Sequence, residues 1–312
     1  MSVELLMMDS GAFSVWTKGS EVDLDAYIEF CKDHLDVIDV IVALDVIPGR
    51  PGDKASLTRE NIETSCELGW KNYQRMLKAG LPVEKVLPVF HQNDDFKWLR
   101  RFIRRGVPYF GISPANDRTS YQRQLWLDQC MRIVCDDKGM PKAKFHGFAV
   151  TSVPLMLRYP WYSCDSASWL RCAMYGGVMI PWTEPDGERN YLKTPRVVNF
   201  STKNDLRKEK GAHYDSMNAA HKKQVDKYLK DMGVVIGKSS YRREERKYKV
   251  SARGEENIFC RHEDHVIVEK IEVAGVSNSV AVRAVVNMRY MEEVEKRIEW
   301  PRPFKSMKRG LI

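Results

Sequence analysis

The sequence predicts an α/β protein: a (β/α)8 TIM-like barrel over residues 1–200 and a basic, mixed α/β region over residues 201–312. Short apolar runs alternate with longer helical patterns through the first 200 residues, which favours a parallel sheet covered by helices. Polar residues stand at the carboxyl end of nearly every apolar run, as they do on the rim of a closed barrel. The competing architecture is an open, doubly wound sheet, but no GxGxxG follows the first expected strand.

The first half of the barrel region supplies four strands and four helices. Asp94 is expected to cap the helix that begins at residue 95, and Gly80 to end the long helix before it. The expected strands are 3–9, 37–45, 84–91 and 108–114, and the expected helices are 22–35, 59–80, 95–106 and 119–134.

The remaining elements are shorter and more basic. Four further strands are expected at 143–150, 159–165, 177–182 and 196–200, with a short helix at 166–176. The last third opens with basic, mostly helical sequence at 201–211, 215–233 and 238–249. It then continues with a possible hairpin at 268–286 and a helix at 289–301.

The charge of the chain is unevenly distributed. The net charge is +8, yet residues 1–50 hold 3 Lys and Arg against 10 Asp and Glu. Residues 201–250 hold 14 against 7, and residues 101–150 hold 9 against 4. Such basic segments indicate a polyanionic partner, most often a nucleic acid, although a solvated lysine-rich face has the same composition.

The cysteines and the start of the chain predict a cytoplasmic protein. The seven cysteines are an odd number and form no CxxC pair, which is typical of reduced thiols rather than of a disulfide framework. The start has no basic segment and no small-residue cleavage site, and no apolar run is long enough to cross a membrane. A membrane partner is therefore not expected.

Chemically active residues gather at the ends of the expected strands. They are Asp9, Asp45, His91, Gly111, His146 and Asp165. Each aspartate could simply cap the next helix, but Asp9 and Asp45 do not stand directly before one. Small residues after Asp9, namely Ser10 and Gly11, would let a flat ligand approach the backbone. Two carboxylates facing each other across a sugar suit chemistry at a glycosidic carbon.

Six segments, in order and between residues 3 and 185, resemble the tRNA-guanine transglycosylase superfamily. They are MDSGAF, VALDVIPG, PVFHQ, YFGIS, FHGFAVTS and YSCDSASWL. The resemblance implies a covalent mechanism in which Asp165 attacks C1′ of a guanosine and Asp9 is the general acid and base. It also implies that Asp45 reads the edge of the base and that Gly111 offers backbone contact.

The resemblance assigns the remaining binding positions less directly. Phe13 would form one face of the base sandwich, and His146 falls about where the other face lies. His91 stands where the family has a glutamine, and a shift of one residue would give that role to Gln92. The second glycine of the family's first motif is replaced by alanine.

The C-terminal part departs from the tRNA enzymes of this superfamily. Their structural zinc site corresponds here to Cys260, His262 and His265, with two ligand types changed and no fourth ligand evident. A polar loop with incidental histidines is the alternative. No cofactor is expected for the chemistry itself.

A compact barrel with an altered C-terminal part resembles the superfamily's DNA-modifying branch, which occurs in bacteriophages and some bacterial islands. That branch exchanges guanine in DNA for a 7-deazaguanine such as 7-cyano-7-deazaguanine. Three alternatives stay open: a tRNA-guanine transglycosylase, a non-catalytic nucleic-acid-binding subunit on the same barrel, and a generic retaining glycosidase. A homodimer, as in the tRNA relatives, is possible under this reading.

Overall fold

The computed structural model describes residues 5–115, 117–202, 211–251 and 254–304, and it divides the chain into two compact units. Unit 1 comprises residues 1–151, 155–166 and 299–312, and unit 2 comprises residues 152–154 and 167–298. Each unit is described by itself below. Much of the basic stretch expected at 201–211 lies outside the described residues.

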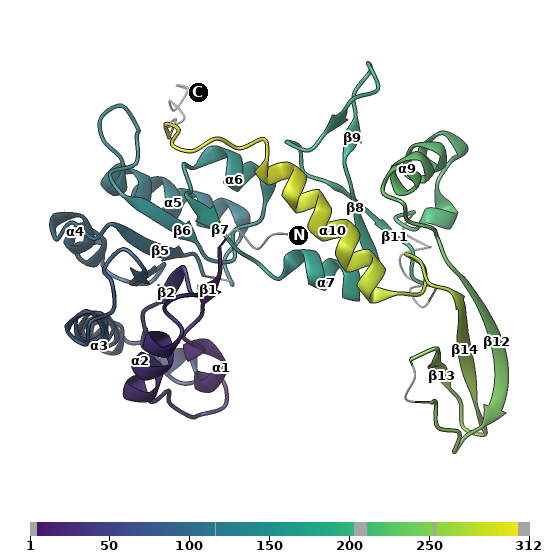
Figure 1. Ribbon diagram of the computed structural model, residues 1–312, viewed down its shortest axis with the longest axis horizontal. Helices are drawn as coiled ribbons and strands as arrows, with labels where there is room; N and C mark the ends of the chain where they lie inside the picture. The colour runs from purple at the N-terminus through teal and green to yellow at the C-terminus, as the bar shows by residue number, and fades with distance from the viewer. Residues whose placement is uncertain (1–4, 116, 203–210, 252–253, 305–312) are drawn as a thin grey trace. The chain divides into compact units, whose positions relative to one another are not determined.

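Unit 1 is built on parallel strands that pair in the order in which they occur in the chain (Figure 1). The strands are β1 (Met7–Met8), β2 (Val40–Val42), β3 (Val86–Leu87), β4 (Val89–His91), β5 (Tyr109–Ser113), β6 (Lys144–Gly147) and β7 (Ser163–Cys164). β1, β2 and β3 form one sheet, and β4 to β7 form another. Pro88 stands between β3 and β4, where its missing N–H interrupts the ladder.

Helices follow most of these strands, so the expectation of alternating strands and helices around parallel sheets is confirmed. They are α1 (Ala12–Trp16), α2 (Leu24–Asp33), α3 (Arg59–Lys78), α4 (Phe96–Arg104), α5 (Ser120–Val134) and α6 (Val153–Arg158). Side-chain oxygens of Asp23, Thr58 and Thr119 cap α2, α3 and α5. The cap of α4 is Asp95 rather than the expected Asp94, which is occupied elsewhere.

The two faces of the sheets bury different residues. The outer face carries large apolar side chains such as Phe90, Phe110 and Phe145, which pack against the helices in the main core. The inner face has a smaller cluster in which Val40, Val42, Leu87 and Tyr109 are buried, with side chains of the β1 and β7 regions packed against it. Sheets buried on both faces explain why the strands are continuously apolar.

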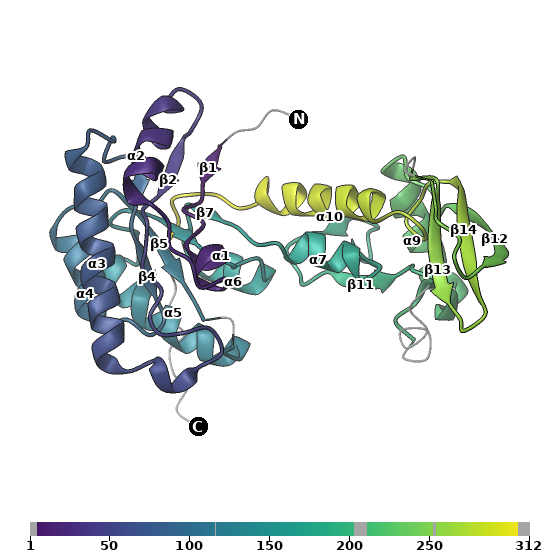
Figure 2. The same ribbon diagram turned by 90° about the horizontal axis from the view of Figure 1, so that it is seen from below.

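The strand order leaves β1 and β7 at its two ends. In both views these strands lie near one another (Figures 1 and 2), and Met7 and Tyr162 pack against the same inner cluster. Within the described residues no strand pairing joins β1 to β7. The pairing therefore shows parallel sheets with alternating helices and does not by itself show a closed barrel.

The seventh and eighth expected strands exist, but they do not extend the parallel sheets. β8 (Gly177–Ile180) and β11 (Arg196–Asn199) pair with each other in antiparallel fashion and belong to unit 2. Only about 15 residues separate them, and no helix lies between them among the described residues, so a parallel crossover is not available.

The other elements of unit 2 are helices and short antiparallel strands. They are α7 (Ser168–Met174), β9 (Trp182–Thr183), β10 (Arg189–Asn190), α9 (Ala219–Asp231), β12 (Lys238–Glu245), β13 (Glu256–Arg261), β14 (His265–Val273) and α10 (Val280–Glu295). The last three strands form a sheet in the order β12-β14-β13. The helix expected at 166–176 is confirmed by α7.

Two expectations for unit 2 are wrong. Residues 238–245 form strand β12 instead of a helix, because each residue pairs along β14. The hairpin expected at 268–286 is instead the end of β14 followed by the start of α10, whose N-terminus is capped by Ser279. Within α10, Asn287 is fully buried and bonds the backbone of Trp169, Gly177 and Met179, which fixes α10 on α7 and β8.

No helix in the described part of the chain is both long and apolar enough to cross a membrane.

Candidate active site

The inner face of the parallel sheets gathers polar side chains toward the carboxyl ends of the strands. Side chains alternate between faces along a strand, and the register sets His146 beside both Gly111 and Ser163. His91 pairs with Ser113 in the same way. The sequence pattern of polar strand ends therefore corresponds to a real surface of unit 1.

The turn after β1 brings Ser10 toward Asp45. Gly11 adopts φ 70° at the start of α1, a left-handed conformation that favours glycine. The hydroxyl of Ser10, which is buried, lies 3.4 Å from Oδ1 of Asp45. Phe13, on α1, is 63% exposed and is therefore free to contact a ligand.

His91 bridges two carboxylates. Its Nε2 donates to Oδ2 of Asp45 at 2.9 Å, and its Nδ1 donates to Oδ2 of Asp94 at 3.3 Å. Burial lowers the pKa of His91, but the hydrogen bonds and charges of Asp45 and Asp94 outweigh it and raise that pKa to about 10. At neutral pH the ring is therefore a cation held between two carboxylates.

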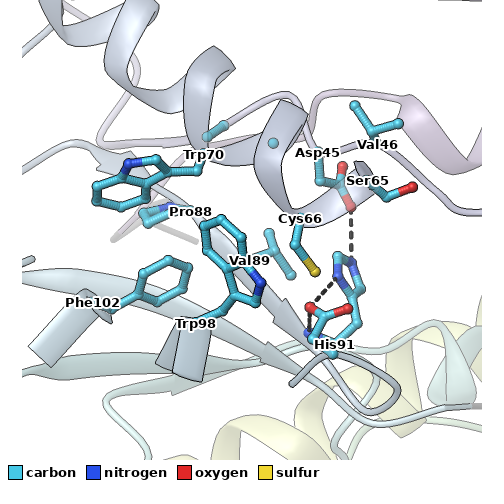
Figure 3. Close-up of a pocket in the computed structure, with 13 residues that line it drawn as sticks. Asp45, Val46, Ser65, Cys66, Trp70, Pro88, Val89, His91, Trp98 and Phe102 are labelled. Carbon is cyan, nitrogen blue, oxygen red and sulfur yellow. Dashed lines mark hydrogen bonds and ion pairs between the residues drawn. The ribbon is translucent and has the colours of Figure 1, made fainter. Parts of the chain in front are cut away.

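Figure 3 shows the cavity behind this cluster, between α3, α4 and the sheet. Its volume is about 30 Å³, which is enough for roughly one water molecule. Cys66 lines it beside Asp94, and burial together with that carboxylate raises the pKa of its thiol. This cavity is too small for a base, so it does not hold the substrate expected from the sequence.

The side chain of Gln92 makes no hydrogen bond to Asp45, His91 or Asp94 among the described residues. Its amide oxygen instead accepts the backbone N–H of Ala115 at 2.8 Å. Of the two candidates for the glutamine position of the resemblance, His91 is the one that contacts Asp45.

Asp165 is held from one side. Its Oδ1 accepts from Nε2 of His146 at 3.2 Å and from the backbone N–H of Ala149 at 3.1 Å. Ala149 adopts φ 54°, an uncommon conformation for a residue with a Cβ, and this points its amide at the carboxylate. The side chain of Asp165 is still 57% exposed.

The same contacts set the charge of Asp165. Partial burial raises its pKa, but the hydrogen bonds from His146 and from the amide of Ala149 outweigh this effect. The net effect is a pKa below the usual value for an aspartate. Asp165 is therefore an exposed, ionised carboxylate, which a nucleophile must be.

His146 is not placed to stack on a ligand. Only 2% of the residue is exposed, and both ring nitrogens are engaged, Nε2 with Asp165 and Nδ1 with Ser163 at 2.7 Å. The structure gives His146 a contact with the carboxylate in place of the stacking role expected from the sequence.

Gly111 is buried under an aromatic ring. A Cβ built at Gly111 would lie 2.3 Å from the ring of Phe148 and 3.0 Å from Leu87, so a side chain here would have to displace that ring. Its N–H donates to the carbonyl of Pro88 at 2.8 Å. The ring of Phe148 therefore occupies the place beside Gly111 where the family resemblance implied that the base would bind.

Asp9 and Asp165 follow the two end strands of the order, β1 and β7. Asp9 lies two residues beyond Met7, which packs on the inner cluster, and its side chain is exposed. No hydrogen bond to the carboxylate of Asp9 occurs among the described residues, which leaves it available to a substrate.

The expected zinc ligands lie in unit 2, at the turn between β13 and β14. Sγ of Cys260 is 3.3 Å from Nε2 of His262, and the rings of His262 and His265 stack with centroids 4.4 Å apart. His265 is also paired with Asp264 at 2.6 Å. In the described ranges no three His, Cys, Asp or Glu side chains are arranged to hold a metal ion.

Sequence reasoning missed three residues that contact the site. They are Asp94, Tyr109 and Ser163. Ser163 precedes Asp165 by two positions and Tyr109 precedes Gly111 by two, so the strand period of two could have placed both on the inner face.

Comparison with known proteins identifies no relative: no family model, no curated protein and no solved structure matches this chain.

Proposed function

We propose that the protein is a guanine transglycosylase that exchanges guanine in DNA for a 7-deazaguanine base, such as 7-cyano-7-deazaguanine. The observation that carries this proposal is the environment of Asp165, which is exposed, has a lowered pKa and is held through Oδ1 alone by His146 and Ala149. The sequence resemblance supplies the substrate class.

The fold that this proposal uses is a TIM-like barrel whose carboxyl rim holds the site. The sequential order of the parallel strands supports it, because right-handed crossovers then put every helix on the same face. The nearness of β1 and β7 in Figures 1 and 2 also supports it. Catalytic groups in such barrels come from the ends of several strands.

The reaction needs two displacements at C1′. In the first, Oδ2 of Asp165 forms an ester bond to C1′ while the bond from C1′ to N9 of guanine breaks, and Asp9 supplies a proton to the leaving base. In the second, Asp9 takes a proton from the 7-deazaguanine, whose N9 attacks C1′ and releases Asp165. Two inversions retain configuration, and no water or oxidant is consumed.

Base recognition is assigned to Asp45. The protonated ring of His91 donates to Oδ2 of Asp45 and holds the carboxyl group in position. Oδ1, near Ser10, would then accept the N–H groups on the amino-pyrimidone edge of the base. Exposed Phe13 would stack on the base, which must leave the helix to reach the site.

The nucleic-acid partner is supported by a cationic groove in unit 1. The groove lies between α4 and α5, and none of the residues that line it is acidic. Its cations are Arg100, Arg104 and Arg132. Arginines on both walls of a groove match the phosphates of a nucleic-acid backbone.

Unit 2 offers a second basic surface on α9. Lys223, Lys227 and Lys230 form no ion pair within the described residues. The arginines of β12 are less available, because Arg242 pairs with Glu244 and Glu256 and Arg243 pairs with Asp264. We therefore assign nucleic-acid contact in unit 2 to α9 more than to β12.

The test is a base-exchange assay. The protein is incubated with DNA or tRNA that carries labelled guanine, together with 7-cyano-7-deazaguanine, and release of the label is measured. We expect release from DNA, no release with Asp165→Asn, and unchanged nucleic-acid affinity in that variant. Asp137→Asn, an exposed aspartate outside the site, is the matched control and should behave as the wild type.

Each other outcome has a defined meaning. Release from tRNA alone would replace DNA by tRNA as the substrate. Binding without release from either polymer would favour the non-catalytic nucleic-acid-binding subunit. Full activity of Asp165→Asn would remove Asp165 as the nucleophile.

A further inference from the structure

A chain of hydrogen bonds runs from the interior of unit 1 to Asp165. The hydroxyl of Tyr109 lies 2.5 Å from Oγ of Ser163, and Oγ of Ser163 lies 2.7 Å from Nδ1 of His146. Nε2 of His146 lies 3.2 Å from Oδ1 of Asp165. Tyr109 and His146 are 3% and 2% exposed, so water has little access to these groups.

The direction of these bonds follows from counting protons. The hydroxyl of Ser163 carries one proton and has two neighbours in the described part of the chain, Tyr109 and His146. If Ser163 donates to Nδ1 of His146, Tyr109 can donate to Ser163, and every proton has an acceptor. His146 then carries its proton on Nε2 and donates it to Asp165.

The reverse direction leaves a buried donor unpaired. If Nδ1 of His146 donated to Ser163, Ser163 would have to donate to Tyr109. The phenolic proton of Tyr109 would then have no acceptor among the described residues, because its hydroxyl contacts only Ser163. An unpaired buried donor is costly, so the first direction is favoured.

We propose that Tyr109 and Ser163 are positioning residues that fix the tautomer of His146 and, through it, the orientation of the nucleophile Asp165. The catalytic part of this inference rests on the proposed function, whereas the tautomer does not. With Oδ1 held by Nε2–H of His146 and by the amide of Ala149, Oδ2 is the oxygen left to attack C1′. In functional histidines, the hydrogen bond made by one ring nitrogen commonly determines which nitrogen carries the proton.

Nitrogen-15 NMR of the intact, histidine-labelled protein tests the tautomer without any substrate. We expect a protonated Nε2 and an unprotonated Nδ1 for His146 at neutral pH, with the signal assigned by its loss in His146→Gln. If that variant does not fold, a selective shift of one signal in Phe148→Leu makes the assignment, because the centroid of the Phe148 ring lies 4.5 Å from that of His146. A protonated Nδ1 in the wild type would overturn the proposal.

Variants test the role of the two positioning residues. Tyr109→Phe and Ser163→Ala should each let His146 populate a second protonation pattern, while Ser163→Thr keeps the hydroxyl and should keep the wild-type pattern. Unchanged nitrogen shifts in both Tyr109→Phe and Ser163→Ala, at unchanged thermal stability, would also overturn the proposal. If Ser163→Thr also lost the wild-type protonation pattern of His146, the hydroxyl group at position 163 would not be what fixes the tautomer, and the proposal would be overturned.

Base-exchange kinetics distinguish an effect on the orientation of Asp165 from a general loss of folded protein. In Ser163→Ala we expect kcat to fall about tenfold or more with the KM for nucleic acid unchanged, and Ser163→Thr to restore it. If the wild type exchanges no base but the NMR result holds, the proposed function fails and the tautomer assignment stands. If exchange occurs and kcat is unchanged in Ser163→Ala, the positioning role fails and the proposed function stands.

Discussion

Nε2 of His91 lies 2.9 Å from Oδ2 of Asp45, and the same imidazole contacts Asp94 through Nδ1. The contact engages Oδ2 of Asp45, so Oδ1 is the oxygen of this carboxylate that is left on the side of Ser10. The contact also ties the end of β4 to the loop after β2, which are separated by 46 positions in the sequence.

The first prediction concerns pH. The pKa of His91 rises from 6.5 to about 10 on folding, so the stability it contributes is fully present below pH 6.5 and is lost as the pH rises through about 10. His91→Gln should therefore cost about 1–3 kcal/mol in the free energy of unfolding at pH 7. The difference from the wild type should shrink by pH 10.5.

Urea unfolding at both pH values measures this effect. His221→Gln, on the exposed surface of α9, controls for the loss of an imidazole. A difference between His91→Gln and the wild type that stays constant across this range would contradict the charged state of His91.

The second prediction concerns Gly111. Gly111→Ala should destabilise the protein by about 1–3 kcal/mol, because the new methyl group would overlap the ring of Phe148. Gly69→Ala in α3 is the matched control, since the nearest atom to its Cβ is 3.9 Å away and alanine favours a helix. Thermal unfolding compares them.

A double variant makes this prediction sharper. Adding Phe148→Leu to Gly111→Ala should recover part of the lost stability by making room for the methyl group. If Gly111→Ala alone is as stable as the wild type, the close packing of Phe148 on Gly111 is not present in solution.

The third prediction concerns the groove between α4 and α5. Replacing Arg100, Arg104 and Arg132 by glutamine should weaken DNA binding about 10- to 100-fold and reduce the salt dependence of binding. Fluorescence anisotropy at several salt concentrations measures both quantities. The control replaces Arg59, Lys71 and Lys78 on α3, which lowers the net charge equally.

Equal weakening by the two triple variants would mean that net charge alone governs binding. Unchanged affinity in the groove variant would move nucleic-acid contact to another surface, with α9 as the remaining candidate.

Local patterns in the sequence predicted much of unit 1. Apolar runs predicted the strands, and helical patterns ending at Gly80 and Gly106 predicted the helices α3 and α4. The polar residues at the ends of the apolar runs predicted where polar side chains gather in unit 1. The sequence alone does not show which of the adjacent residues Asp94 and Asp95 caps α4. Asp95 is the cap, because the carboxylate of Asp94 already accepts the backbone N–H of His91.

Pairing partners were harder to predict than strands. β8 and β11 have ordinary strand sequences, and nothing in their residues says that they pair with each other and not with β7. β12 is rich in charged residues that suit an exposed helix, and its strand state depends on β14, more than 20 residues later. The contacts of His146 were missed because a buried ring between two polar groups has no local sequence signal.

The positions of Asp9 and Asp165, after the first and last strands of the parallel order, bear on how the protein is made. During synthesis from the N-terminus, Asp9 emerges early, while Asp165 emerges only after every other strand of unit 1. The proposed reaction requires both carboxylates, so its site would be complete only after the last strand of unit 1 has been made. An unfinished or truncated unit 1 would carry only one of them, and we expect it to be inactive in the base-exchange assay.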